Sequence, residues 1–255
     1  MQYATYPSLR NRPVVISGGA TGIGAALVRA FAEQGSKVGF VDIATAEGEA
    51  LAADLNAAGH TVRFTACDVT DIPAYQAAIA GFAAAHGPAL ALVNNAAHDE
   101  RHDWQDVTPE EWDRRQAVNL KHAFFAIQAV APGMIAAGQG AIVNFGSVSW
   151  MVMSPRIPVY LTAKAAAKGL TRAMARELGK QGIRVNTLTP GQVMTEKQRK
   201  LVVDEEFERN LDRVQALADR IMPDDIARMA LFLAADDSRM ISGQDFLVDA
   251  GWAHG

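Results

Sequence analysis

Apolar and polar positions along this 255-residue chain follow two alternating patterns. Short continuous apolar runs, rich in β-branched residues, alternate with longer alanine-rich amphipathic segments. The first pattern is typical of strands buried on both faces, and the second of the helices that cover such strands. We therefore expect strands at residues 13–17, 37–41, 62–66, 89–94, 141–145, 184–189 and 246–248, and helices at 22–34, 46–58, 74–86, 109–137, 158–179 and 224–235.

This alternation predicts an α/β fold, a doubly wound Rossmann-type domain with a seven-stranded parallel sheet. The chain has no Gly/Ser or Pro linker, low-complexity tract or long repeat, so we expect residues 1–255 to form a single domain. A charged stretch at about 194–221 interrupts the pattern. It could be a solvated helical insertion or a mobile lid over the site, and the two readings are compatible.

Composition narrows the function classes. With 49% apolar and 20% charged residues the chain resembles an ordinary globular protein, and its net charge of −4 gives no basic excess for nucleic acid. Cys67 is the only cysteine, so an internal disulfide is excluded. A lone cysteine also argues against a Cys-based zinc site, and we expect no metal. The N-terminus lacks an apolar core of signal-peptide type, and no apolar run reaches the ~20 residues of a membrane span. We expect a cytoplasmic protein that does not bind membranes.

A glycine-rich run follows the first expected strand and precedes the first expected helix. It reads Ser17-Gly18-Gly19-Ala20-Thr21-Gly22-Ile23-Gly24. Such a run could be a plain turn, but in this position glycines let the backbone approach a pyrophosphate, which the helix N-terminus attracts. We predict dinucleotide contacts at Ser17, Gly18, Thr21, Gly22, Ile23 and Gly24.

Polar residues at the ends of the next strands extend this predicted site. Asp42, at the end of the second strand, could accept both adenosine ribose hydroxyls and would repel a 2′-phosphate. Two unit charges ~4 Å apart cost roughly 4 kcal/mol at an effective dielectric of 20, which favours NAD over NADP. Asp68-Val69 and Asn95-Ala96 could border the nucleotide, or could be simple turn residues.

Tyr160 and Lys164 lie four residues apart in an expected helix, so they share one face. A neighbouring ammonium favours the phenolate and would lower the tyrosine pKa from ~10. Such a tyrosine can take a proton from an alcohol or return it to a carbonyl. Ser147 follows the fifth strand at the ligand edge of the sheet, where it could donate a hydrogen bond to a substrate oxygen.

Together these motifs resemble the short-chain dehydrogenase/reductase family over nearly the whole chain. The resemblance rests on the glycine loop, Asn94-Asn95-Ala96, Asn119, Ser147, Tyr160, Lys164 and Pro190-Gly191. It implies Tyr160 as acid/base, Lys164 on the nicotinamide ribose, Ser147 on the reacting oxygen and Asn119 on a water in the proton path. It also implies cofactor contacts at Tyr160, Lys164, Pro190, Gly191, Val193 and Thr195. Ala97 departs from the family's usual glycine, which a negative φ would tolerate.

A narrower resemblance points to bacterial aldose 1-dehydrogenases of the D-xylose dehydrogenase type. It rests on the segments Tyr6-Pro7-Ser8-Leu9, Asp99-Glu100-Arg101-His102, Asn144 to Trp150 and Asp249-Ala250-Gly251-Trp252. Sugars need several directed hydrogen bonds, and Trp150 could stack on a pyranose or simply be core. We predict substrate contacts at His98, Asp99, Arg101, His102, Ser147, Ser149, Trp150, Tyr160 and Gln192.

These residues lead us to expect NAD-dependent oxidation of an aldose at its anomeric carbon, giving a sugar lactone. Another alcohol, of hydroxysteroid or 3-hydroxyacyl type, would suit the apolar Met151-Val152-Met153. A dinucleotide-sensing protein without catalysis is the alternative from a different class. The family resemblance implies a homotetramer.

Overall fold

Seven parallel strands form one sheet in the computed structural model, which describes residues 3–196, 198 and 205–253. The strand order is β3-β2-β1-β4-β5-β6-β7, with every neighbouring pair parallel. The strands are β1 Pro13–Ser17, β2 Lys37–Asp42, β3 Thr61–Ala66, β4 Ala91–Asn94, β5 Gly140–Phe145, β6 Ile183–Pro190 and β7 Asp245–Val248. The predicted doubly wound α/β fold is confirmed.

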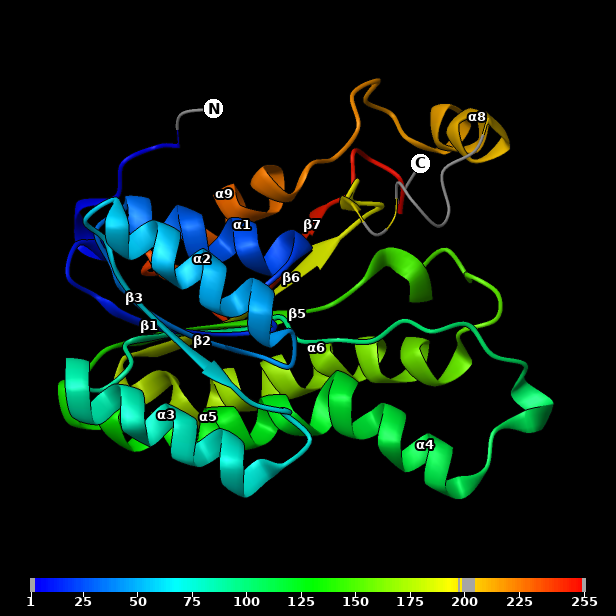
Figure 1. Cartoon of the computed structure of the whole chain (residues 1–255). Coiled ribbons are helices and arrows are strands. Elements are labelled where there is room, and N and C mark those ends of the chain that lie inside the picture. The colour runs from blue at the N-terminus through cyan, green and yellow to red at the C-terminus, as the bar shows by residue number, and fades with distance from the viewer. Residues whose placement is uncertain (1–2, 197, 199–204, 254–255) are drawn as a thin grey trace.

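Helices cover both faces of the sheet (Figure 1). One face carries α1 (Gly22–Glu33), α2 (Thr45–Ala57) and α9 (Pro223–Ala234). The other carries α3 (Ile72–His86), α4 (Pro109–Gln116), α5 (His122–Ala137) and α6 (Pro158–Leu178). The described residues also include short helical turns: η1 Pro7–Leu9, η2 Trp104–Asp106, η3 Ala117–Lys121, η4 Val148–Trp150, η5 Gly179–Gln181 and η6 Asp236–Ser238.

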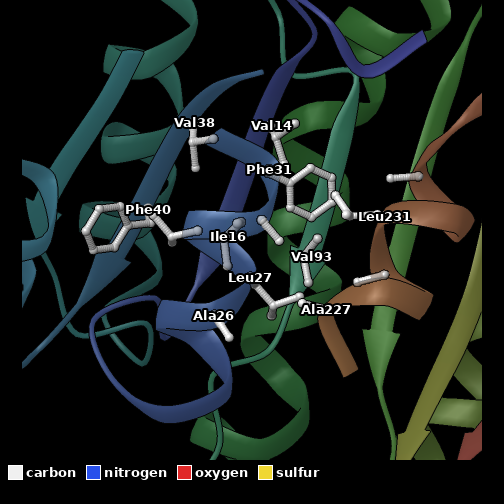
Figure 2. Close-up of a cluster of buried hydrophobic side chains, with 14 of the residues drawn as sticks. Val14, Ile16, Ala26, Leu27, Phe31, Val38, Phe40, Val93, Ala227 and Leu231 are labelled. Carbon is white, nitrogen blue, oxygen red and sulfur yellow. The ribbon is translucent and has the colours of Figure 1, made fainter. Parts of the chain in front are cut away.

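The strands send alternate side chains into two cores, as the period of two requires. On β1, Val14 and Ile16 join the core under α1 and α9, whereas Val15 joins the core under α3 and α5. Figure 2 shows the core under α1 and α9, where Leu27 and Phe31 of α1 meet Val14 and Ile16. Burial on both faces explains why the strands read as continuous apolar runs.

The expected helix at 109–137 contains an irregular turn. Helix α4 passes through the π-helical turn η3 into α5, and such bulges are often found at functional sites. By length and composition alone the continuous segment Pro109–Ala137 could cross a bilayer, a test that core helices also pass. Its α5 portion packs on β4, β5 and α3.

Helix α8 (Glu205–Val214) occupies part of the charged insertion at about 194–221. The backbone after α8 joins the C-terminal turn, where the Ala216 N–H donates to the Ala250 carbonyl at 2.8 Å. Residues 197 and 199–204 lie outside the described residues, so the lid reading stays a prediction, as does the single-domain boundary.

Candidate active site

A cleft of about 1010 Å³ opens at the carboxyl ends of the strands. Ligands bind at this edge in open parallel sheets. Its wall includes fourteen of the residues predicted from sequence: Gly18, Thr21, Gly22, Ile23, Gly24, Asp42, Asp68, Val69, Asn95, Ala96, His98, Asp99, Tyr160 and Thr195. The structure thus brings the glycine loop and the tyrosine to one cavity.

Ten further residues line this cleft but were not predicted as site residues. They are Ala20, Ala25, Ile43, Cys67, Thr70, Ala97, Arg114, Val118, Glu196 and Gln198. Most are sequence neighbours of predicted residues, and that adjacency is the signal that could have found them. Arg114 and Val118 are different because they come from α4 and η3, which no ligand motif marks.

The glycine loop is held close to the end of β4. Gly18 has φ +67°, and a Cβ there would lie 2.8 Å from the Ala96 Cα. A Cβ on Gly24 would overlap the Gly18 carbonyl. Asn95 fixes the loop by donating from Nδ2 to the carbonyls of Gly18 at 2.7 Å and Ser17 at 3.1 Å. Gly18 is therefore required both by its positive φ and by its close approach to Ala96, and Gly24 is required by its close approach to the Gly18 carbonyl.

Ser17 lies behind the cleft wall and supports it. Its side chain is fully buried, and its Oγ accepts from the N–H groups of Asn95 and Ala96, each at 3.1 Å. Ser17 is absent from the residues lining the cleft. Its predicted contact with the dinucleotide is untested, and the structure shows a bridge between β1 and β4.

Asp42 presents its carboxylate where the cleft meets the glycine loop. Its Oδ2 accepts from the Ala20 N–H at 2.9 Å, and its Oδ1 accepts from the Ala44 N–H at 3.0 Å. Each carboxylate oxygen has a further lone pair for another donor. The side chain thus both orders the loop and faces the cleft.

Lys164 and Ser147 lie next to Tyr160, which lines the cleft. The ammonium of Lys164 lies 5.7 Å from the centroid of the Tyr160 ring. Ser147 is buried, and its Oγ donates to the Ser149 Oγ at 2.9 Å. Tyr160 keeps partial exposure at the cleft wall.

The expected lowering of the Tyr160 pKa by Lys164 is wrong in this structure. Burial raises the pKa of Tyr160 to about 12; a hydrogen bond with Ser147 lowers it in part, and Asp99 raises it. The Lys164 ammonium instead donates to the Phe145 carbonyl at 3.0 Å. Burial also lowers the pKa of Lys164 to about 8, against the opposing effect of Asp99.

Asn119 is held in the π-helical turn η3, with its side chain fully engaged. Its Nδ2 donates to the carbonyls of Arg115 at 2.9 Å and His98 at 3.1 Å, and its Oδ1 accepts from the His98 N–H at 2.8 Å. In this arrangement Asn119 anchors the loop after β4. Its predicted role on a water in the proton path is untested.

The remaining predicted residues are not among those that line the cleft. Ser149 and Trp150 form η4 beside Ser147, and both are partly buried. The other residues in this group are Pro190 at the end of β6, Gly191 and Gln192 after it, Val193, which bridges to Ile221, and Arg101 and His102 on the loop after β4. Ala97 causes no strain, because the non-glycine residues with positive φ are Asn11, Met153, Arg156 and Ala250 in the described part of the chain.

The cleft fits a dinucleotide. The Cβ-free surface at Gly18 gives backbone access to a phosphate, and the first N–H groups of α1 have no partner within the helix. Asp42 lies on the same wall, and Tyr160 and Thr195 also line the cleft. Across the described residues, no cluster of three His, Cys, Asp or Glu side chains is placed to hold a metal.

Comparisons with known proteins agree with this geometry. Residues 18–253 match the family model described as enoyl-(acyl carrier protein) reductase, a model of the short-chain dehydrogenase/reductase family. The chain is 44% identical over 252 residues to D-xylose 1-dehydrogenase of Caulobacter vibrioides, covering 99% of this chain and 100% of the relative. It is also 44% identical over 247 residues to a probable galactose dehydrogenase, GalD, of Rhizobium meliloti, covering 96% of each.

A solved structure supports the same assignment. Gluconate 5-dehydrogenase of Burkholderia cenocepacia, in complex with NADP and tartrate, superposes with a TM-score of 0.90 at 33% identity, covering 98% of each chain. The chain therefore belongs to the short-chain dehydrogenase/reductase family and is an oxidoreductase.

Proposed function

We propose that this enzyme oxidises an aldose at its anomeric carbon with NAD, giving a sugar lactone that water opens to the aldonic acid. The observation that carries the proposal is the shared cleft of Tyr160, His98 and Asp99. A candidate proton acceptor there adjoins polar side chains that can bind several hydroxyl groups. The similarity to two relatives named as sugar dehydrogenases supports the same substrate class.

The chemistry assigns separate tasks to the residues around Tyr160. NAD, held by the glycine loop, Asp42 and Thr195, would supply the hydride acceptor for the anomeric carbon. Tyr160, as phenolate, takes the proton of the C1 hydroxyl, and Ser147 donates a hydrogen bond to that oxygen as it becomes a carbonyl. Lys164 relays the proton onward, and Asn119 holds a water in that path. Loss of one hydride and one proton converts the hemiacetal carbon into the lactone carbonyl.

Asp42 supports NAD rather than NADP as the cofactor. Its carboxylate faces the cleft beside the glycine loop, where it would repel a 2′-phosphate. Asp42→Asn keeps an oxygen that can accept from the Ala20 N–H but removes the charge. We expect this variant to lower the NAD-to-NADP ratio of kcat/KM by roughly 10² to 10³. An unchanged ratio would remove Asp42 from cofactor selection.

The assembly is proposed to be a homotetramer. Light scattering coupled to size exclusion should then give four times the chain mass of 27.3 kDa. A monomeric or dimeric mass would contradict it.

Substrate choice is tested by supplying NAD with a panel of aldoses, hydroxysteroids and 3-hydroxyacyl thioesters and following NADH absorbance. We expect a strong rate with one or two aldoses and a weak rate with the other classes. Strong turnover of a steroid or hydroxyacyl substrate without any sugar activity would sink the aldose assignment but leave the oxidoreductase assignment intact.

A further inference from the structure

The loop at residues 98–103, between β4 and η2, carries two cleft residues but has no regular secondary structure. His98 and Asp99 line the cleft, and both are partly buried. A loop that must read individual hydroxyl groups loses affinity if binding has to order it first. The contacts that hold its backbone therefore matter for recognition.

Arg115 of α4 contacts the middle of this loop without lining the cleft. Its side chain is only 5% exposed. Nη1 donates to the Glu100 carbonyl at 2.9 Å, and Nη2 donates to the Glu100 Oε2 at 3.2 Å. The guanidinium thus contacts both the backbone and the side chain of one loop residue.

The carboxylate of Glu111 fixes the orientation of this guanidinium. Arg115 Nε donates to the Glu111 Oε1 at 2.9 Å, within the same helix. Arg114 in turn holds Glu111 with two hydrogen bonds, at 2.9 and 2.8 Å. A buried cation is tolerated only when it is paired, and here two carboxylates pair it.

Asn119, one turn further along the helical segment, clamps the start of the same loop. It both donates to and accepts from the backbone of His98. The far end of the loop is tied by the His102 N–H, which donates to the Arg156 carbonyl at 2.8 Å. Backbone contacts thus fix His98, Glu100 and His102, while the side chains of His98 and Asp99 face the cleft.

We propose that Arg115 is a positioning residue for substrate recognition, which fixes the loop at 98–103 so that His98 and Asp99 meet the hydroxyl groups of the sugar in a set arrangement. The proposal rests on the proposed function. A guanidinium is suited to this task because its planar fork bonds a carbonyl and two carboxylates at once, whereas an ammonium is a point charge. Arg115 does not line the cleft, so it acts through the loop and not on the substrate.

The test compares Arg115→Met and Arg115→Lys with wild type and with Arg29→Met, a control at an exposed position of α1. We expect Arg115→Met to raise KM for the sugar by on the order of tenfold or more, since a site built on paired polar groups loses affinity when those groups are misplaced. The KM for NAD should stay close to that of wild type, and kcat should fall less than KM rises. Arg115→Lys should recover part of the sugar affinity, and Arg29→Met should match wild type.

Hydrogen exchange of the loop gives a readout that needs no substrate. The amides of residues 98–103 should exchange faster in Arg115→Met than in wild type, and thermal unfolding should show that the variant is folded. Unchanged loop exchange with an unchanged sugar KM would overturn the proposal, as would equal losses for sugar and NAD. If wild type oxidises no sugar, the proposed function fails; the exchange result then still reports whether Arg115 fixes the loop.

Discussion

At the scale of single residues, the proposed chemistry depends on one phenol. Tyr160 lines the cleft, and a hydrogen bond with Ser147 lowers the Tyr160 pKa in part against the effect of burial. Tyr160→Phe removes the proton acceptor but keeps the ring. We expect kcat to fall by roughly 10² to 10⁴ while NAD binding, followed by fluorescence titration, stays near wild type. Tyr6→Phe, in the segment before η1, is the matched control. If Tyr160→Phe kept the turnover of wild type, Tyr160 could not be the base.

The raised pKa of Tyr160 sets the pH dependence of oxidation. Because burial raises this pKa to about 12, the phenolate is a minor species at neutral pH and its share grows about tenfold per pH unit below the pKa. We expect the logarithm of kcat/KM for the sugar to rise steadily from pH 6 to pH 9, as measured with saturating NAD. A profile that is flat over this range counts against Tyr160 as the base.

His122 makes stability depend on pH in the acid range. It is buried, its Nε2 lies 3.1 Å from the Ala96 carbonyl, and burial lowers its pKa from 6.5 to about 3. Below pH 6.5 His122 is protonated in the unfolded chain but stays neutral in the folded chain. The free energy of unfolding therefore decreases as pH falls from 6.5 towards 3. From pH 6.5 to pH 5 we expect urea unfolding to show a loss of roughly 2 kcal/mol from this residue.

His122→Gln provides the comparison for this effect, because the amide can still donate to the Ala96 carbonyl. Its stability should fall less steeply over the same range. Parallel curves for the variant and wild type would show that His122 is not the group responsible.

At the scale of elements, the turn from β1 into α1 depends on glycine for its close approach to β4. Gly18→Ala places a methyl against the Ala96 backbone at a positive φ. Gly59→Ala is the matched control, since Gly59 also has positive φ, at +90°, but no atom within 4 Å of a built Cβ. We expect both variants to lose on the order of 1 kcal/mol from backbone strain and Gly18→Ala to lose more, together with a raised KM for NAD. Equal effects in stability and in KM would mean that the close approach to Ala96 has no role.

The strands and most helices could be predicted because each keeps one burial pattern along its length: the central strands are buried on both faces, and the helices alternate buried and exposed positions with the helical period. The observed β1 has the predicted bounds, and α3 begins two residues earlier, where Asp71 caps it by accepting from the Ala74 N–H. The π-helical turn η3 escaped prediction because its sequence continues the helical pattern on both sides. The bulge occurs together with the hydrogen bonds of Asn119 to the backbone of His98, which is distant in the sequence. Such long-range contacts cannot be read from the local sequence.

At the scale of the whole molecule, topology predicted the cleft because parallel strands bring their carboxyl ends to one edge. Asp42, Asp68 and Asn95 come from three strand ends and line one cavity. Burial, in contrast, is a property of the folded molecule, so the spacing of Tyr160 and Lys164 alone gave the wrong direction for the Tyr160 pKa. The contacts of Arg115 with Glu100 were equally hidden, since the two residues are fifteen positions apart in the sequence, with loop and helix between them.

The proposed reaction at the anomeric carbon is tested most directly with an aldose deuterated at C1. We predict that the NADH formed carries the deuterium and that the other product is the lactone. The value of kcat/KM should fall relative to the unlabelled sugar if hydride transfer limits the rate. NADH free of deuterium would show that the hydride comes from another carbon, and absence of NADH with every aldose would contradict the sugar substrate itself.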